Sequence, residues 1–266
     1  VTTSSTISNS TASNASTGSY VNGANTIYFG VKGNGSQVGG LVGYQSSGSI
    51  TGSTANTTVV GLSSSVGGLV GYLDSAPVTS SGSNGSVSGV GNVGGLVGAM
   101  YGSSSATTSY ANANVTSTGN NTGGFVGYFN TYNSITNSRA ASSVSGTAYV
   151  GGFVGLMTYS GGISASYATG MVNATSDGAG GFLGYSSDTA YTRTLQDFYA
   201  TGAVTGTTNV GGLVGYAARA TFNYGYSTGM VTSRTGATSV GASFGGVGTG
   251  TTVTGTVPNQ VTTYWV

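Results

Sequence analysis

The sequence predicts an all-β protein, a single-stranded parallel β-helix (β-solenoid) of about eight coils of 27–31 residues. Three observations support this fold class. Glycine accounts for 51 of the 266 residues, while charged residues make up only 3%. A seven-residue phrase, VGGLVGY, returns at nearly constant intervals. A second phrase alternates small and large residues with the period of a β-strand.

The composition limits what the chain can be. Disordered chains combine low hydrophobicity with high net charge, whereas this chain is 37% hydrophobic and nearly uncharged. A net charge of +1 with five scattered cations provides no basic stripe for nucleic-acid phosphates. Without His or Cys, the usual ligands of zinc, haem and iron–sulfur clusters and the Cys–His or Ser–His catalytic pairs are missing. We therefore expect no metal, no cofactor, no nucleic-acid partner and no enzymatic activity, and the short apolar runs predict no membrane span.

The VGGLVGY phrase recurs once in every repeat. Its copies are separated by 28, 27, 29, 28, 29, 31 and 30 residues. They begin at Val38, Val66, Val93, Thr122, Val150, Ala179 and Val210, with a degenerate copy at Val240. A period this steady is typical of a solenoid in which each coil contacts only its neighbours.

The second phrase follows the pattern apolar-x-x-Ser-x-Ala-x-Gly-x-Val, as in ISASYATGMV, residues 163–172. Its small residues alternate with larger ones, so we predict a strand with the small residues facing inward. The copies begin at Ile50, Val78, Ala106, Ile135, Ile163, Leu195 and Phe222. One coil would bury about five apolar side chains, each of which stabilises the fold by about 1.5–3 kcal/mol. Ordering the backbone costs about 1–2 kcal/mol of conformational entropy for every residue, which is more than one coil gains. Each coil must therefore be stabilised by its neighbours, in a rod of about 40 Å at a spacing of about 4.8 Å.

The Leu or Phe of VGGLVGY has two possible orientations. Strict alternation places it opposite Val42 and its equivalents, whereas a bulge at the Gly–Gly step would turn it inward. We expect the inward orientation, because an exposed apolar ladder of this length would promote aggregation. The residues concerned are Leu41, Leu69, Leu96, Phe125, Phe153, Phe182 and Leu213.

The phrases SYATGMVNATSDGAGGFLGY and FYATGAVTGTTNVGGLVGY resemble the GLUG-motif repeat, named for its Gly-Leu-hydrophobic-Gly core. The resemblance covers about residues 27–250, and residues 7–16 are similar to a partial second phrase. The family occurs in bacterial surface and secreted proteins, including haemagglutinin-like adhesins and some immunoglobulin A peptidases. The resemblance implies an extracellular or cell-surface β-helical module. It does not imply peptidase activity, because the chain lacks the His and Glu of a His-Glu-x-x-His zinc helix.

We expect three parts in the chain. Residues 1–26 form a polar cap or arm, residues 27–250 the solenoid, and residues 251–266 a C-terminal strand, cap or assembly segment. The last segment is apolar and carries the single tryptophan, so we expect it to pack on the last coil or on another copy. Its candidate assembly residues are Tyr264, Trp265 and Val266.

Outward residues of the second phrase should stack into columns from coil to coil. One column contains Tyr110, Arg139, Tyr167, Tyr199 and Tyr226. Such a column can stack on sugar rings, pack against another rod, or simply stabilise the stacked strands. A neighbouring column raises the possibility of ice binding, which needs flat threonine arrays, but it is irregular. It contains Asn56, Asn84, Asn112, Ala141, Thr169, Thr201 and Thr228.

Two further patterns are less specific. The run GVGNVG at residues 89–94 matches a nucleotide-binding loop, but chance matches are expected in a glycine-rich chain and no helix is predicted after it. Asp188, Arg193 and Asp197 gather near the longest insertion, with Asp177 one segment away. Carboxylates suit calcium, yet we expect a solvated loop with one surface ion pair.

These observations favour a scaffold over a catalyst. The first hypothesis is an extracellular structural protein, a subunit of a self-assembling filament or surface layer joined through rod ends or exchanged terminal strands. Its basis is the scarcity of charge, which leaves little electrostatic defence against self-association. The alternative is a glycan- or surface-binding adhesin module or stalk, with an ice-binding solenoid as a minor alternative. The expected partners are copies of the chain itself, or else glycans and cell surfaces.

Overall fold

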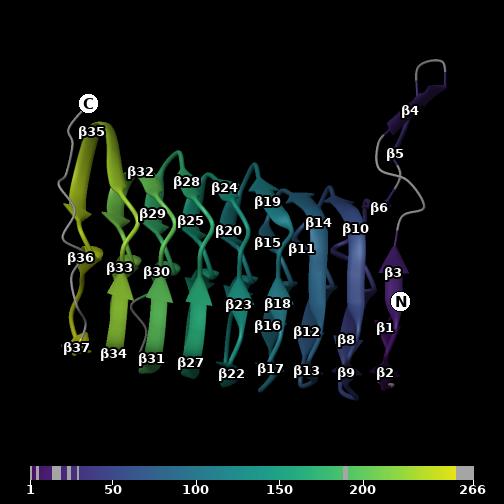
Figure 1. Ribbon diagram of the computed structural model, residues 1–266, viewed down its shortest axis with the longest axis horizontal. Helices are drawn as coiled ribbons and strands as arrows, with labels where there is room; N and C mark the ends of the chain where they lie inside the picture. The colour runs from purple at the N-terminus through teal and green to yellow at the C-terminus, as the bar shows by residue number, and fades with distance from the viewer. Residues whose placement is uncertain are drawn as a thin grey trace.

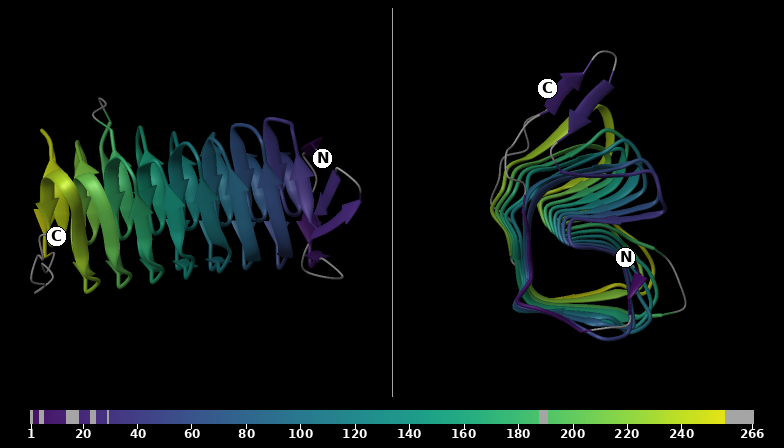
Figure 2. Two further views of the ribbon diagram at one scale, coloured as in Figure 1. Left: turned by 90° about the horizontal axis from the view of Figure 1, so that it is seen from above. Right: turned by 90° about the vertical axis from the view of Figure 1, so that its right-hand side faces the viewer.

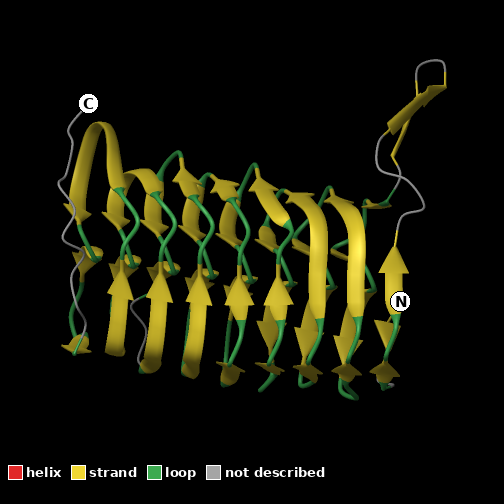
Figure 3. Cartoon of the chain, viewed as in Figure 1, coloured by secondary structure: helices red, strands yellow, loops and turns green. Residues whose placement is uncertain are grey.

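The computed structural model describes residues 2–3, 6–13, 19–22, 25–28, 30–187 and 191–255. Over these residues the chain is a rod of stacked coils whose strands run across the long axis, and no helix is present (Figures 1 and 3). Neighbouring coils pair through parallel ladders. The predicted all-β solenoid of about eight coils is therefore confirmed.

Each coil passes through four segments, and the first segments of all coils form a nine-stranded sheet. This sheet contains β1 (Thr2–Thr3), β8 (Val42–Ser46), β12 (Val70–Asp74), β16 (Val97–Tyr101), β21 (Val126–Phe129), β26 (Val154–Met157), β30 (Leu183–Ser186), β33 (Val214–Ala217) and β36 (Phe244–Val247). The first segment carries the LVGY part of each phrase, so this part of the repeat makes one flat wall of the rod.

The remaining segments belong to the second, 26-stranded sheet. The second segments begin at β2 (Ile7–Ser8), β9 (Ile50–Thr51), β13 (Pro77–Thr79), β17 (Ser105–Thr107), β22 (Asn133–Thr136), β27 (Gly161–Ala168), β31 (Arg193–Ala200), β34 (Ala220–Ser227) and β37 (Thr252–Thr254). The third segments contain β3 (Thr11–Ser13), β6 (Val31–Gly33), β10 (Thr54–Gly61), β14 (Gly82–Gly89), β18 (Tyr110–Ala111), β19 (Asn114–Ser117), β23 (Arg139–Ala140), β24 (Val144–Gly146), β28 (Val172–Ala174), β32 (Val204–Gly211) and β35 (Val231–Gly241). The fourth segments contain β7 (Gln37–Gly39), β11 (Ser65–Gly67), β15 (Asn92–Gly94), β20 (Asn120–Gly123), β25 (Ala148–Gly151) and β29 (Asp177–Gly180), and continue as the ends of β32 and β35. A separate two-stranded antiparallel sheet pairs β4 (Ser19–Asn22) with β5 (Asn25–Tyr28).

The register of the ladders follows the two phrases. Val38 pairs with Val66, and Val66 pairs with Val93, as the period predicts. At the N-terminal end, Ile7 pairs with Ile50, so the segment similar to a partial second phrase lies in the ladder of the first coil. The strands β1, β2 and β3 thus belong to the rod, within the part of the chain expected to form a cap or arm.

Each coil is pinched in the middle, which divides the core into two columns of apolar residues (Figure 2). At the pinch, the second glycine of VGGLVGY faces the Ala or Ser of the second phrase. A Cβ added at Gly152 would overlap the carbonyl oxygen of Gly181 and lie 3.2 Å from the Cβ of Ala168. The repeat therefore needs glycine on one wall and a small residue on the other, because the two walls touch there.

The Gly–Gly step contains a bulge in every coil. Two successive amides, those of Leu69 and Val70, both donate to the carbonyl oxygen of Leu96, a pattern typical of a β-bulge. The bulge turns the following Leu or Phe inward, and from Leu69 to Leu213 these side chains are fully buried. Leu41 is only partly buried, but it packs on the same core. The predicted inward orientation is confirmed.

Serines of the second phrase form a buried hydrogen-bonded ladder. The hydroxyl of Ser138 accepts from the amide of Ser109 at 3.2 Å and donates to the carbonyl of Thr136 at 2.9 Å. The same arrangement links Ser53, Ser81, Ser109, Ser138 and Ser166. In the next coil Phe198 takes this position, and Gly225 follows it because a Cβ there would lie 2.6 Å from the Phe198 ring.

Candidate functional site

The predicted aromatic column forms on the outer side of β18, β23, β27, β31 and β34. Register pairs join Tyr110 to Arg139, Arg139 to Tyr167, Tyr167 to Tyr199, and Tyr199 to Tyr226. The rings of Tyr199 and its two tyrosine neighbours stack at 4.8 and 5.0 Å, with interplanar angles of 2° and 8°. The guanidinium of Arg139 lies 5.0 Å from the centre of the Tyr110 ring. These five side chains therefore follow one another in register along the rod.

The stacking decides what this column can bind. Because the rings are parallel and in contact, each ring of the Tyr167–Tyr199–Tyr226 stack covers the face of the next. A sugar ring packs on an aromatic face, so Tyr199 can offer only its edge and hydroxyl to a ligand. Burial and the neighbouring Tyr167 and Tyr226 raise the pKa of Tyr199, in keeping with a side chain whose partners are other tyrosines.

The neighbouring polar column bonds to itself. The amide of Asn84 donates to Asn56 at 2.6 Å, and that of Asn112 donates to Asn84 at 2.9 Å. The column then changes to Ala141 and to exposed threonines from Thr169 onward. The array of regular hydroxyls that ice binding requires does not form along this column.

A second aromatic ladder, which the sequence analysis missed, lies on the outer side of the nine-stranded sheet. It follows the last residue of VGGLVGY, where Tyr44, Tyr72, Tyr128, Tyr185 and Tyr216 recur in register except at Ala99 and Leu156. At Ala99 the ring of Tyr101 fills the gap and stacks on Tyr72 at 4.8 Å. At Leu156 the ring of Tyr149 packs on Tyr185 at 4.5 Å. The recurring final Tyr of the phrase was the signal that could have revealed this ladder.

Tyr101 is the most perturbed member of this second ladder. Its ring lies between Tyr72 and Tyr128, 5.5 Å from the latter. Burial, followed by the effect of these two tyrosines, raises the pKa of Tyr101 to about 12. Burial and the nearby Asp74 also raise the pKa of Tyr72. Both shifts favour the neutral phenols of Tyr72 and Tyr101, whose partners in the ladder are other aromatic rings.

The expectation of a solvated loop with a surface ion pair is wrong for Arg193. Its side chain is fully buried, and its Nη1 donates to the carbonyls of Ala218 at 3.0 Å and Arg219 at 3.2 Å. The register explains the burial, because Arg193 lies between Gly161 and Ala220, whose small size leaves room inside the rod.

The acidic residues of the cluster are dispersed. Asp177 accepts from the amide of Asn209 at 2.7 Å, and the exposed Asp197 accepts from Gln196 at 3.1 Å. Asp188 lies outside the described residues, as do Tyr264, Trp265 and Val266. In the described ranges, no three side chains of His, Cys, Asp or Glu lie close enough to hold a metal ion. The GVGNVG run passes from the end of β14 into β15, where the glycines serve close backbone packing.

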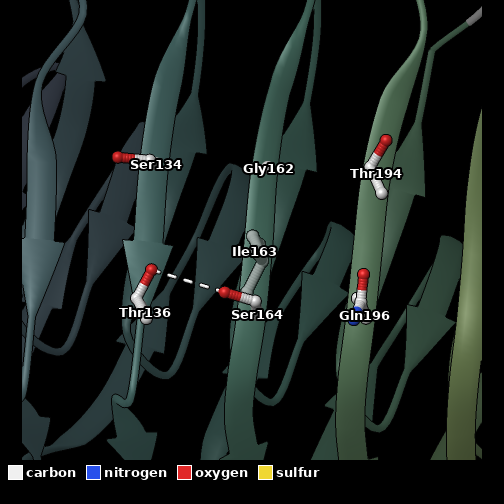
Figure 4. A pocket seen from close by; sticks show the side chains of 7 residues that line it. All are labelled: Ser134, Thr136, Gly162, Ile163, Ser164, Thr194 and Gln196. Atoms are coloured by element: carbon white, nitrogen blue, oxygen red, sulfur yellow. Dashed lines mark hydrogen bonds between the residues drawn. The ribbon is translucent and has the colours of Figure 1, made fainter.

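Two shallow hollows lie on the outer walls. One has a volume of about 260 Å³ and lies over the third segments, between Asn114, Ser143 and Met171. The other has a volume of about 190 Å³ and lies over β22, β27 and β31 (Figure 4). Its polar side chains are Ser134, Thr136, Ser164, Thr194 and Gln196.

Comparison with known proteins identifies one unit of the repeat. The family model described as the GLUG motif matches residues 34–60, which confirms the resemblance seen in the sequence. This stretch contains the VGGLVGY copy at Val38 and the second phrase that begins at Ile50, and the ladder repeats both in the following coils. No curated protein and no solved structure gives a significant match. Within the part of the chain that the structure describes, no helix has the length and apolarity to span a bilayer.

Proposed function

We propose that the chain is an extracellular structural repeat protein that assembles with copies of itself into a filament or surface layer, and that it has no catalytic role. The observation that supports this proposal most is the nearly uncharged surface of a rod whose backbone is bonded from coil to coil. Nine charged residues among 266 provide little repulsion between rods.

Exposed apolar side chains add attraction between such surfaces. Leu62, Val90, Met171 and Met230 have exposed fractions of 54%, 47%, 62% and 50%. Burying side chains of this kind between rods removes apolar area from water and favours association. The GLUG motif and the solenoid fold fit a repeat-type structural or adhesin-like protein.

Sedimentation velocity across a wide range of protein concentrations, combined with negative-stain electron microscopy, tests the proposal. We expect particles that grow with concentration into filaments if rods join at their ends, or into layers if they join at their walls. The double variant Met171→Lys/Met230→Lys should reduce growth if the third-segment wall takes part, and Lys32→Gln is the control for a general effect of charge. A single rod-sized species at all concentrations would contradict the proposal.

A second candidate function is a glycan- or surface-binding adhesin module or stalk. One observation favours it: exposed tyrosine side chains lie at one corner of the rod, two or three residues before the residues that line the hollow over β22, β27 and β31. A binding assay separates this function from assembly, because a rod can assemble without binding a glycan.

A further inference from the structure

Three tyrosines lie with exposed rings at one corner of consecutive coils, between the first and second segments. Tyr132, Tyr159 and Tyr191 have exposed fractions of 60%, 41% and 43%. The ring centres of Tyr159 and Tyr191 lie 5.5 Å apart and the rings are tilted by 41°, so neither ring covers the other as in the parallel Tyr167–Tyr199–Tyr226 stack. The preceding coils have small residues at this corner, namely Ser47, Ser75 and Ser103. The aromatic corner is thus a local feature of three coils and not a product of the repeat.

Each of the three tyrosines comes two or three residues before a residue that lines the hollow of Figure 4. Tyr132 precedes Ser134 on β22, and Tyr191 precedes Thr194 on β31, while β27 between them has Gly162 at the matching position. The absent side chain of Gly162 opens the hollow, because an added Cβ would meet only the carbonyl oxygen of Thr194, at 3.7 Å.

The hollow contains neutral hydrogen-bonding groups. The hydroxyls of Thr136 and Ser164 lie 3.4 Å apart on neighbouring strands, and Ser134, Thr194 and the amide of Gln196 complete the rim. None of the lining residues is charged. A carboxylate or sulfate group would find no cation here to pair with, and the exposed Asp197 beside Gln196 would repel it.

Exposed aromatic rings near a neutral, hydroxyl-lined hollow are complementary to a sugar, which has an apolar face and a polar edge. One face of a hexopyranose carries C–H groups that pack on an aromatic ring, and its edge carries hydroxyls that bond to Ser, Thr and amide groups. We propose that this corner and hollow bind one hexopyranose unit of a neutral oligosaccharide, with the adjoining units lying along the tyrosines of neighbouring coils. This inference rests on the second proposed function, the glycan-binding module, and names its site and ligand class.

Isothermal titration calorimetry with neutral tetrasaccharides of glucose, mannose and galactose, and with tetragalacturonate as the acidic probe, tests the site. At least one neutral probe should bind. Tyr159→Ser removes a ring and installs a small residue with a left-handed backbone, as the chain has at this corner at Ser47, Ser75 and Ser103. Gly162→Thr fills the hollow where space is open. Each change should lower the association constant by at least about tenfold, while thermal unfolding followed by circular dichroism should stay close to that of the parent protein.

Tyr199→Ser is the matched control, because it removes a tyrosine from the stack whose faces are covered. It should leave the association constant within about twofold. Full affinity in Tyr159→Ser and Gly162→Thr, or loss of binding in Tyr199→Ser, would move the site elsewhere while leaving the glycan-binding function standing. Binding of the acidic probe alone would overturn the ligand class. No binding of any probe would overturn both the site and the second function. A larger thermal hysteresis in ice-growth assays of the Gly162→Thr variant would overturn the sugar site in favour of ice binding at this wall.

Discussion

The phenylalanine stack in the core of the rod and the Tyr167–Tyr199–Tyr226 stack on its surface share one geometry but differ in burial. In the core, Phe153 stacks on its two phenylalanine neighbours at 4.7 and 4.6 Å, with interplanar angles of 7° and 11°. On the surface, Tyr199 stacks on its neighbours at 4.8 and 5.0 Å and at 2° and 8°. The geometry is nearly the same although one ring is fully buried and the other is not. The spacing of the coils therefore sets the stacking, and burial and free ring faces decide what a stack contributes.

The largest expected effect comes from the inner stack. Phe153→Ala should lower the free energy of unfolding by about 3–5 kcal/mol, because it leaves a cavity in a close-packed core. Urea denaturation followed by circular dichroism measures it. Phe153→Leu is the control and should cost about 1.5 kcal/mol or less, since Leu occupies the same column at Leu96 and Leu213. A loss below about 1 kcal/mol for the alanine variant would show that the ring is not in the core.

A smaller effect is expected when the buried serine ladder is interrupted. Ser138→Ala leaves the amide of Ser109 without its hydroxyl acceptor inside the rod, which should cost about 1–3 kcal/mol. Amide hydrogen exchange should show faster exchange at Ser109, and Ser134→Ala, an exposed serine four residues away, should change neither quantity. Unchanged protection of Ser109 would argue that the ladder contributes nothing.

The outer stack should contribute less than either inner ladder. Tyr199→Ala should lower the free energy of unfolding by about 1 kcal/mol, the usual size of a cross-strand aromatic contribution at a partly exposed site. A double-mutant cycle with Tyr226→Ala should give a coupling of about 0.5–1.5 kcal/mol. A cost comparable with that of Phe153→Ala would mean that burial does not separate the two stacks.

The last prediction concerns the dependence of stability on pH, and the expected change appears only above neutral pH. The folded state holds the proton of Tyr101 more tightly than the unfolded chain, since its pKa is raised from 10.0 to about 12. The corresponding stability is fully present below pH 10 and is lost as the pH rises through about 12. Stability curves between these limits should fall less steeply for Tyr101→Phe than for the parent protein. Identical slopes would show that the ring is not desolvated in the ladder.

Much of the fold could be predicted from the sequence because every coil of a solenoid repeats the same strands in the same register. Val38, Val66 and Val93 had to align, since only a constant period keeps parallel ladders in register. The same register aligns Tyr167, Tyr199 and Tyr226. The bulge at Gly–Gly was also predictable, because the Leu or Phe had to be removed from solvent.

The sequence pattern failed where side chains depart from the repeat. Tyr101 and Tyr149 fill gaps left by other positions, and nothing in the spacing of the phrases shows that their rings reach there. Arg193 appeared to be a surface cation because charged residues are usually exposed. Its burial depends on Gly161 and Ala220, which are distant in sequence and adjacent only through the ladder.

The sequence by itself determined the parallel solenoid, its period and the residues that share a column, because these depend only on spacing and on which side chains are small or apolar. Tertiary structure alone decided the pinched shape of the coil, the left-handed backbone of corner residues such as Ala165 and Tyr159, and the open hollow at Gly162. These depend on how closely two walls approach and how sharply the chain turns between them. Such distances are set by the packing of all coils together and are not recorded in the period of any one repeat.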